Sequence, residues 1–188
     1  GGTFEIASVP IQSSGGAPPQ IFVAGARAFF VGGTFFSFPP DKELWITDGT
    51  QAGTHQVRDL TPSGGTDFYS LAALGDRLFF SVASALPDLP AQNGALWVSD
   101  GTEAGTTIVR DIGLVERGFV VVVGSLEPPI FVRAGGKAFF TANNGDDSAS
   151  YNPELWVPDG TAGGTRLTRE INTTGSSYAG GMVALGDR

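Results

Sequence analysis

The chain has 188 residues, of which 41% are hydrophobic, with 28 Gly, 12 Pro, 14 Phe and no Cys. A chain of this length and apolar content can form an ordinary domain with its own core. Its formal net charge of -8 and its sequence pI of about 4.4 argue against nucleic acid and anionic membrane surfaces as partners, because both attract basic faces. Cations, neutral sugars and basic proteins remain possible partners.

Three complete repeat units stand between two partial ones. Residues 1–20 begin with GGTFEI, whose GTFEI aligns with GTHQV at 53–57, so they are predicted to hold the last strand of a preceding unit and a linker. Residues 21–70, 71–129 and 130–181 are complete units, and residues 182–188 repeat the first strand of a unit. Self-similarity of this kind is typical of repeat architectures. The partial units predict that the chain is an excerpt of a longer array.

Each unit is predicted to form four short strands. In chain order it holds an apolar strand, a Gly-containing turn, a strand with two adjacent Phe, a loop, a strand centred on Leu-Trp, an Asp-Gly-Thr-x-x-Gly-Thr turn and a last strand. β-branched and aromatic residues crowd the runs, Gly and Pro lie between them, and no window shows helical spacing with caps. The sequence therefore predicts an all-β fold.

The turn and the last strand have a fixed length, whereas the loop before them does not. The distance from Trp to the acidic residue that ends the unit is the same in all three units (45 to 59, 97 to 111 and 156 to 170). The loops that precede the Trp strands differ in length. Ligand contacts are therefore expected in segments 32–42, 81–94, 113–129 and 143–153, since loops on a repeat scaffold carry specificity.

The Leu-Trp strand is apolar on both faces, because Leu44 and Trp45 point to opposite sides of a strand. Strands buried on both faces need sheets stacked on either side. This predicts a β-propeller with four-stranded blades, about three of them complete, plus partial blades at both ends. About four to eight blades close a propeller, so the rest of the propeller or another chain is expected to complete it.

The unit resembles the ELWxxDGT repeat family. The motif reads ELWITDGTQAGT at 43–54, ALWVSDGTEAGT at 95–106 and ELWVPDGTAGGT at 154–165. Its departures are Ala95 and Pro158, and Pro158 is expected inside the Leu-Trp strand. The resemblance implies β-propeller blades in an exported bacterial protein, and hence an extracellular or cell-surface location. It implies no particular activity.

The Asp-Gly-Thr turns admit two interpretations. Their oxygens could bind a hard cation such as Ca²⁺, but recurrence in every unit favours a structural turn closed by Asp and Thr. The fixed register of the Trp residues favours core positions over sugar stacking. The residues assigned to this structural repeat are Trp45, Asp48, Gly49 and Thr50, Trp97, Asp100, Gly101 and Thr102, and Trp156, Asp159, Gly160 and Thr161.

The variable segments hold the candidate ligand-binding residues. The run NNGDDS at 143–148 is rich in oxygen ligands, so Asn144, Asp146 and Asp147 are candidates for a Ca²⁺ site, with a solvated acidic loop as the alternative. Tyr69, Phe119 and Tyr151 join Asp146 and Asp147 as candidates for contacts with a protein or carbohydrate ligand.

Catalysis has little support in the sequence. His55 is the one His and there is no Cys, so no Cys/His pair, zinc site or repeated triad can form, and no catalytic residue or cofactor other than Ca²⁺ is expected. Arg58 and Arg110, each next to the closing Asp, are predicted to face solvent or to pair with nearby carboxylates. No apolar run approaches the about 20 residues of a membrane-spanning helix, so no membrane insertion is expected.

Three hypotheses for function follow. The first is a non-enzymatic surface propeller that mediates binding or adhesion through variable loops. The second is a glycan-active hydrolase at the propeller mouth, which requires a cluster of carboxylates with raised pKa. The third is a structural segment of an extracellular assembly or filament, with chain ends completed by another polypeptide.

Overall fold

The computed structural model describes residues 21–34, 41–60, 62, 66–84, 95–111, 131–143 and 153–172. These residues form three antiparallel sheets of four strands each, and no helix occurs among them. The prediction of an all-β fold is confirmed. Both predicted partial units, 1–20 and 182–188, lie outside the described residues.

Each sheet is a meander in which every strand pairs with the next strand in sequence. Sheet 1 contains β1 (Ile21–Ala24), β2 (Arg27–Thr34), β3 (Asp41–Thr47) and β4 (His55–Arg58). Sheet 2 contains β5 (Thr66–Leu74), β6 (Arg77–Ser84), β7 (Ala95–Ser99) and β8 (Thr107–Asp111). Sheet 3 contains β9 (Phe131–Ala134), β10 (Lys137–Asn143), β11 (Pro153–Val157) and β12 (Arg166–Arg169).

Two strand limits differ from the sequence prediction. β5 begins at Thr66, so the border placed between residues 70 and 71 falls inside this strand. The long β6 supplies partners for the extra residues, as Thr66 lies opposite Ser84, and a bulge between Phe68 and Leu71 joins the two parts. β11 ends at Val157, so Pro158 follows the Leu-Trp strand rather than lying inside it.

The second Phe of each pair lies directly across the sheet from the Trp of the next strand. The register pairs Phe30 with Trp45, and the other two sheets repeat this pairing at Phe80–Trp97 and Phe140–Trp156. The rings stack with centroids 6.2, 6.1 and 6.4 Å apart and interplanar angles of 22°, 21° and 24°. Offset stacking of this kind adds about 0.5–1.5 kcal/mol to the burial of the rings.

A β-bulge interrupts the pairing of the last two strands at the same place in every sheet. In sheet 1, Leu44 lies opposite Arg58 but Trp45 lies opposite Gln56, which leaves Val57 as the extra residue. The register shifts in the same way between Leu96 and Trp97 and between Leu155 and Trp156. One extra residue in the last strand is thus part of the repeat.

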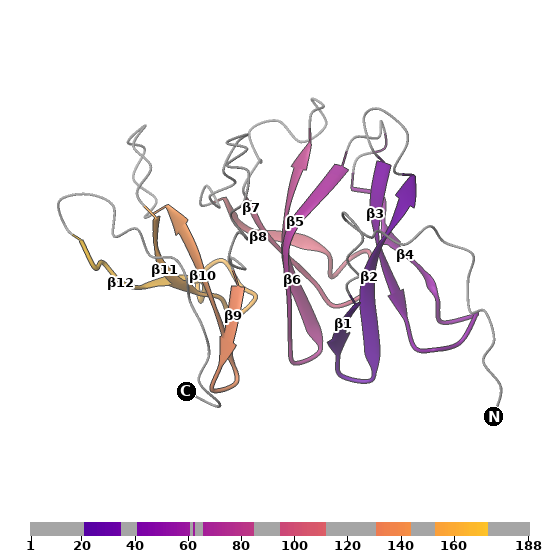
Figure 1. The fold of residues 1–188 in the computed structure, drawn as a ribbon, viewed down its shortest axis with the longest axis horizontal. Helices are drawn as coiled ribbons and strands as arrows, with labels where there is room; N and C mark the ends of the chain where they lie inside the picture. Colours follow the sequence, from indigo (N-terminus) through magenta and orange to yellow (C-terminus); the bar gives the residue numbers. More distant parts are fainter. Residues whose placement is uncertain are drawn as a thin grey trace, which may run out of the picture.

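Each sheet has two apolar faces, named here by the residues of its third strand. The Trp face carries Trp45, Trp97 or Trp156, and the Leu face carries Leu44, Leu96 or Leu155. The Leu face of sheet 1 packs on the Trp face of sheet 2, and the Leu face of sheet 2 packs on the Trp face of sheet 3. Sheet 2 therefore lies between the other two sheets (Figure 1).

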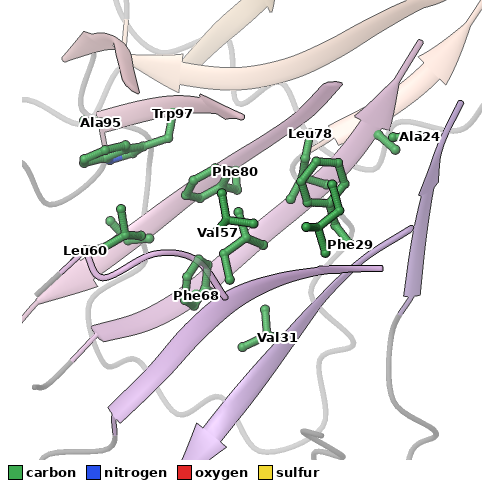
Figure 2. Close-up of a cluster of buried hydrophobic side chains, with 14 residues drawn as sticks. Ala24, Phe29, Val31, Val57, Leu60, Phe68, Leu78, Phe80, Ala95 and Trp97 are labelled. Atoms are coloured by element: carbon green, nitrogen blue, oxygen red, sulfur yellow. The ribbon is translucent and has the colours of Figure 1, made fainter. Parts of the chain in front are cut away.

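The layer between sheets 1 and 2 is filled by aromatic and branched side chains (Figure 2). Phe29, Leu44 and Ile46 of sheet 1 meet Leu78 and Phe80 of sheet 2, and all five are at most 2% exposed. The first strands of the three sheets also contact one another, because β5 of sheet 2 contacts β1 of sheet 1 and β9 of sheet 3. The stacking order is thus the same along the chain: Leu face against the next Trp face.

Candidate functional site

The Asp-Gly-Thr turns join the third and fourth strands, and each is closed by hydrogen bonds within itself. In sheet 1, the Thr50 backbone N–H and hydroxyl both donate to Asp48 Oδ1, at 2.9 and 2.7 Å. The Gly53 N–H donates to Thr50 Oγ1 at 3.0 Å, and the Thr54 hydroxyl donates to the Thr50 carbonyl at 2.6 Å. Sheets 2 and 3 repeat the bonds to Asp100 and Asp159.

A second pair of hydroxyls ties the turn to the end of the third strand. Ser99 Oγ and Thr106 Oγ1 lie 2.8 Å apart, and the Gly101 N–H donates to Ser99 Oγ at 3.0 Å. Thr47 and Thr54 form the same pair in sheet 1, at 2.7 Å. These bonds satisfy polar groups that the packing of the sheets removes from water.

The third turn lacks this second pair. Pro158 stands where sheets 1 and 2 have Thr47 and Ser99, and it offers no hydroxyl. The Thr165 hydroxyl, in a residue that is 0% exposed, has no hydrogen-bond partner among the described residues. The Thr165 N–H instead donates to the Thr161 carbonyl at 3.0 Å.

The hydrogen bonds in the turns lower the pKa of all three Asp residues. The Thr50 hydroxyl and backbone N–H stabilise the ionised form of Asp48, which holds its pKa below the ordinary value of 3.8. The Thr102 hydroxyl and N–H act in the same way on the pKa of Asp100, with a smaller contribution from Arg27. The pKa of Asp159 is lowered mainly by the backbone N–H of Thr161.

The hydrogen bonds and contacts within the turns are enough to explain where the Asp carboxylates lie, without a bound cation. Asp48 Oδ1 already accepts two hydrogen bonds, and the carboxylate lies so close to Gly53 that a Cβ there would overlap it. Asp100 and Asp159 have the same relation to Gly105 and Gly164. Within the described residues, no three His, Cys, Asp or Glu side chains form a group able to hold a metal ion.

Arg58 and Arg110 connect neighbouring sheets by bonds to backbone carbonyls, a role that the sequence did not predict, although Arg110 is exposed as expected. Arg58 Nη1 donates to the Thr106 carbonyl of the next sheet at 2.8 Å, and Arg110 Nη1 donates to the Thr165 carbonyl at 3.0 Å. The Arg110 guanidinium also lies over the Trp156 ring, 5.2 Å from its centroid. The acceptors lie 48 and 55 residues away in sequence, so local spacing could not reveal them.

A second basic residue of sheet 1 and of sheet 2 reaches the same turn of the next sheet. Arg27, which begins β2, donates from Nη2 to the Asp100 carbonyl at 2.9 Å. Arg77, at the start of β6, lies beside Gly160, where an added Cβ would meet its Nη1. The Asp-Gly-Thr turn therefore receives the arginines of the preceding sheet, and this contact surface is what the repeated motif builds.

The Trp residues have different surroundings in the three sheets. Trp97 is 4% exposed and Trp156 is 2% exposed, and Trp156 Nε1 donates to the Ala142 carbonyl at 3.2 Å. Trp45 is only partly buried, because no described sheet covers the Trp face of sheet 1. The two inner Trp side chains are thus packing residues and are not accessible for stacking on a sugar.

Most of the candidate ligand-binding residues lie outside the described residues. Phe119, Asn144, Asp146, Asp147 and Tyr151 are in this group. Tyr69 belongs to β5 and lies in the bulge between Phe68 and Leu71. His55 is an exposed residue at the start of β4.

Comparisons with protein-family models, with curated proteins and with solved structures gave no match. The described part of the chain contains no helix with the length and apolarity required to cross a bilayer.

Proposed function

We propose that the chain is part of a non-enzymatic β-propeller of an exported or surface bacterial protein, and that it mediates binding or adhesion through its variable loops. The observation that carries this proposal is the repetition of one contact set, in which the Asp-Gly-Thr turns of sheets 2 and 3 each receive an arginine from the preceding sheet. A contact repeated in this way belongs to a scaffold. Specificity then falls to the segments that differ between units.

The propeller architecture is supported by the stacking order. Each sheet places its Leu face on the Trp face of the next, and the first strands β1, β5 and β9 follow one another in contact. Radially packed blades satisfy both features, because each blade covers its neighbours and the first strands gather near the axis. Further blades are needed to close the ring, and we assign them to the rest of the propeller or to another chain.

The partner we expect is a neutral glycan or a basic protein segment, in keeping with a net charge of -8. The residues assigned to contact are Tyr69 of β5 and, from the variable segments, Phe119, Asp146, Asp147 and Tyr151. Asn144, Asp146 and Asp147 are the Ca²⁺ candidates. An array carrying neutral glycans and oligolysine, probed with and without Ca²⁺, tests this assignment.

Two variants of the loop at 143–153 make the test specific. Tyr151→Ala and the double variant Asp146→Asn/Asp147→Asn should lower binding at least about tenfold, the loss of one good contact, with an unchanged melting temperature. Thr107→Ala, at an exposed position of β8 outside the loops, serves as control. Binding that the loop variants leave unchanged, or no binding to either probe class, would overturn the loop assignment.

No observation favours the hydrolase hypothesis. Every pKa shift resolved among the described carboxylates is downward, whereas a general acid requires a raised pKa. The assembly hypothesis has specific support, because two outer sheet faces expose the residues that the inner faces bury.

A further inference from the structure

We propose that the Leu face of sheet 3 and the Trp face of sheet 1 are the two halves of one docking interface, and that the occupant of each is a second copy of this chain. Copies would then associate head to tail, sheet 3 of one copy against sheet 1 of the next. This docking is independent of the loop-mediated binding proposed above, since it uses the flat faces of the outer sheets.

The Leu face of sheet 3 exposes residues whose counterparts are buried. Leu155 and Phe139 are partly exposed, whereas Leu44 and Leu96 are both 0% exposed and Phe79 is 1% exposed. Ile171 is 59% exposed, while its counterpart Leu60 in the first unit is 6% exposed and packs in the layer between sheets 1 and 2. Leaving this face in water forgoes the apolar burial that the inner interfaces obtain.

The Trp face of sheet 1 is uncovered in the same way. Ile21 and Val23 of β1 are 60% and 66% exposed, while Ala73, the counterpart of Val23 in sheet 2, is 6% exposed. Gly49 has no described atom within 4 Å of an added Cβ, although its counterpart Gly101 lies tightly under Ile46 of the preceding sheet. Sheet 1 thus presents a receiving surface that no other described sheet covers.

The polar donors and acceptors of these two faces are complementary. Lys137 occupies in sheet 3 the position of Arg27 and Arg77, and Arg169 occupies that of Arg58 and Arg110. Neither has a hydrogen-bond partner among the described residues. In the first turn, the Thr54 and Asp48 carbonyls are the counterparts of the Thr106 and Asp100 carbonyls that accept the arginines of sheet 1.

One matched departure points to a second copy rather than to another apolar sheet. At the bulge, the Leu faces of sheets 1 and 2 carry Val57 and Val109, which pack with Ile108 and Leu167 on the facing Trp faces. The two outer faces carry polar residues at the corresponding positions, Thr168 in sheet 3 and Gln56 in sheet 1.

Docking of sheet 3 on sheet 1 of a second copy brings Thr168 opposite Gln56, so a polar residue meets a polar residue. Docking of either outer face on an inner-type face would instead set a polar side chain against an apolar one, which carries a desolvation penalty. The two outer faces therefore match each other better than they match the faces inside the chain. Contacts of this kind join unlike faces and generate either rings or filaments.

Complementation between two face-blocked variants tests the proposal in the full chain. Ile21→Glu/Val23→Glu blocks the Trp face of sheet 1, and Arg169→Glu/Ile171→Glu blocks the Leu face of sheet 3. All four positions are exposed, so the fold should not change. Sedimentation velocity from about 1 to 300 µM covers affinities from micromolar to millimolar.

The expected result has three parts. The wild-type chain associates, each blocked variant alone is monomeric, and an equimolar mixture of the two variants forms a one-to-one dimer through the remaining pair of intact faces. Thr107→Glu adds one negative charge to the middle sheet, away from both outer faces, and should associate as the wild type does.

Three outcomes would overturn the proposal. A wild-type chain that stays monomeric over the whole range has no such interface. A blocked variant that still dimerises alone would show that like faces pair with each other. A mixture that remains monomeric would mean that the two faces are not complementary, and that a different partner covers them.

Discussion

The Thr165 hydroxyl is buried without a described hydrogen-bond partner, and Pro158 offers no hydroxyl where Ser99 bonds to Thr106. The Thr161 carbonyl accepts from the Thr165 N–H, whereas the Thr102 carbonyl accepts from the Thr106 hydroxyl. The third turn keeps the bonds around Asp159 but has lost the hydroxyl pair that links the turn to its strand. A buried polar group without a partner costs about 1–3 kcal/mol. This turn is therefore the weakest of the three.

Restoring the missing hydroxyl should stabilise the protein. Pro158→Ser supplies an acceptor or donor for Thr165 Oγ1 and an acceptor for the Gly160 N–H, as Ser99 does for its own turn. The matched control is Pro158→Ala, which shares the greater freedom of the unfolded chain but has no hydroxyl. Pro158→Ser should exceed Pro158→Ala in the free energy of unfolding by about 1–2 kcal/mol, measured by urea denaturation. Equal stability of the two variants would contradict the role assigned to the hydroxyl pair.

Comparing Ala substitutions at two turn glycines, Gly49 and Gly101, distinguishes the cost of backbone strain from the cost of overpacking between sheets. Gly49 and Gly101 have nearly the same φ, 88° and 89°, so replacement by Ala strains both backbones alike, by about 1–2 kcal/mol. Only at Gly101 would the added methyl group overlap Ile46 of the preceding sheet.

Gly101→Ala should therefore destabilise the chain by about 1–3 kcal/mol more than Gly49→Ala, the usual cost of overpacking. Thermal or urea unfolding of the two variants at a concentration where the chain is monomeric measures the difference. If both variants lose the same stability, the contact between Gly101 and Ile46 has no energetic weight.

The contribution of each last-strand arginine to the free energy of unfolding should depend on the groups that it contacts in the next sheet. Arg110 donates to a carbonyl and lies over the Trp156 ring, Arg58 donates to a carbonyl, and Arg169 has no described partner. Arg110→Ala is expected to cost about 2–3 kcal/mol and Arg58→Ala about 1–2 kcal/mol, from the charge-assisted bond and the cation–π contact. Arg169→Ala should change the stability of the monomer by less than about 0.5 kcal/mol. The order of the three urea midpoints checks this, and an equal loss at Arg169 would refute it.

Acid should weaken the fold through the turn carboxylates. The pKa of Asp100 is lower in the folded chain than its ordinary value of 3.8, because the Thr102 hydroxyl and N–H stabilise the ionised form. As the pH falls, the unfolded chain binds the proton first. The contribution of Asp100 is thus fully present above the ordinary pKa and is lost as the pH falls through the folded pKa.

Asp100→Asn keeps an acceptor for Thr102 but cannot titrate. Its free energy of unfolding should fall less steeply than that of the wild type between about pH 5 and pH 2, the range in which Asp titrates. Urea unfolding across this range measures both slopes. Parallel curves would mean that the Asp100 pKa is the same in the folded and unfolded chains.

The sequence contained enough to predict the sheets but not the contacts between them. The recurrent Phe pairs, Trp residues and turns led to four strands per unit, because strand and turn signals are local. The role of Arg58 was not predicted since its acceptor, Thr106, belongs to another sheet. An Arg at a fixed distance from each turn was a usable signal, but nothing in the spacing said which sheet it would reach.

The bulge at the Leu-Trp pair gives every sheet a direction. The extra residue Val57 shifts the register by one, so that Arg58 pairs with Leu44 rather than extending the Trp side. Side chains alternate along a strand, so without the bulge the same residues would place Arg58 on the face of Gln56; the extra residue places it on the Leu face, toward sheet 2. A single inserted residue, repeated in each unit, therefore gives the stack of sheets one orientation. A further unit can be added only with its Trp face toward the arginines, because a reversed unit would place its own arginines against them.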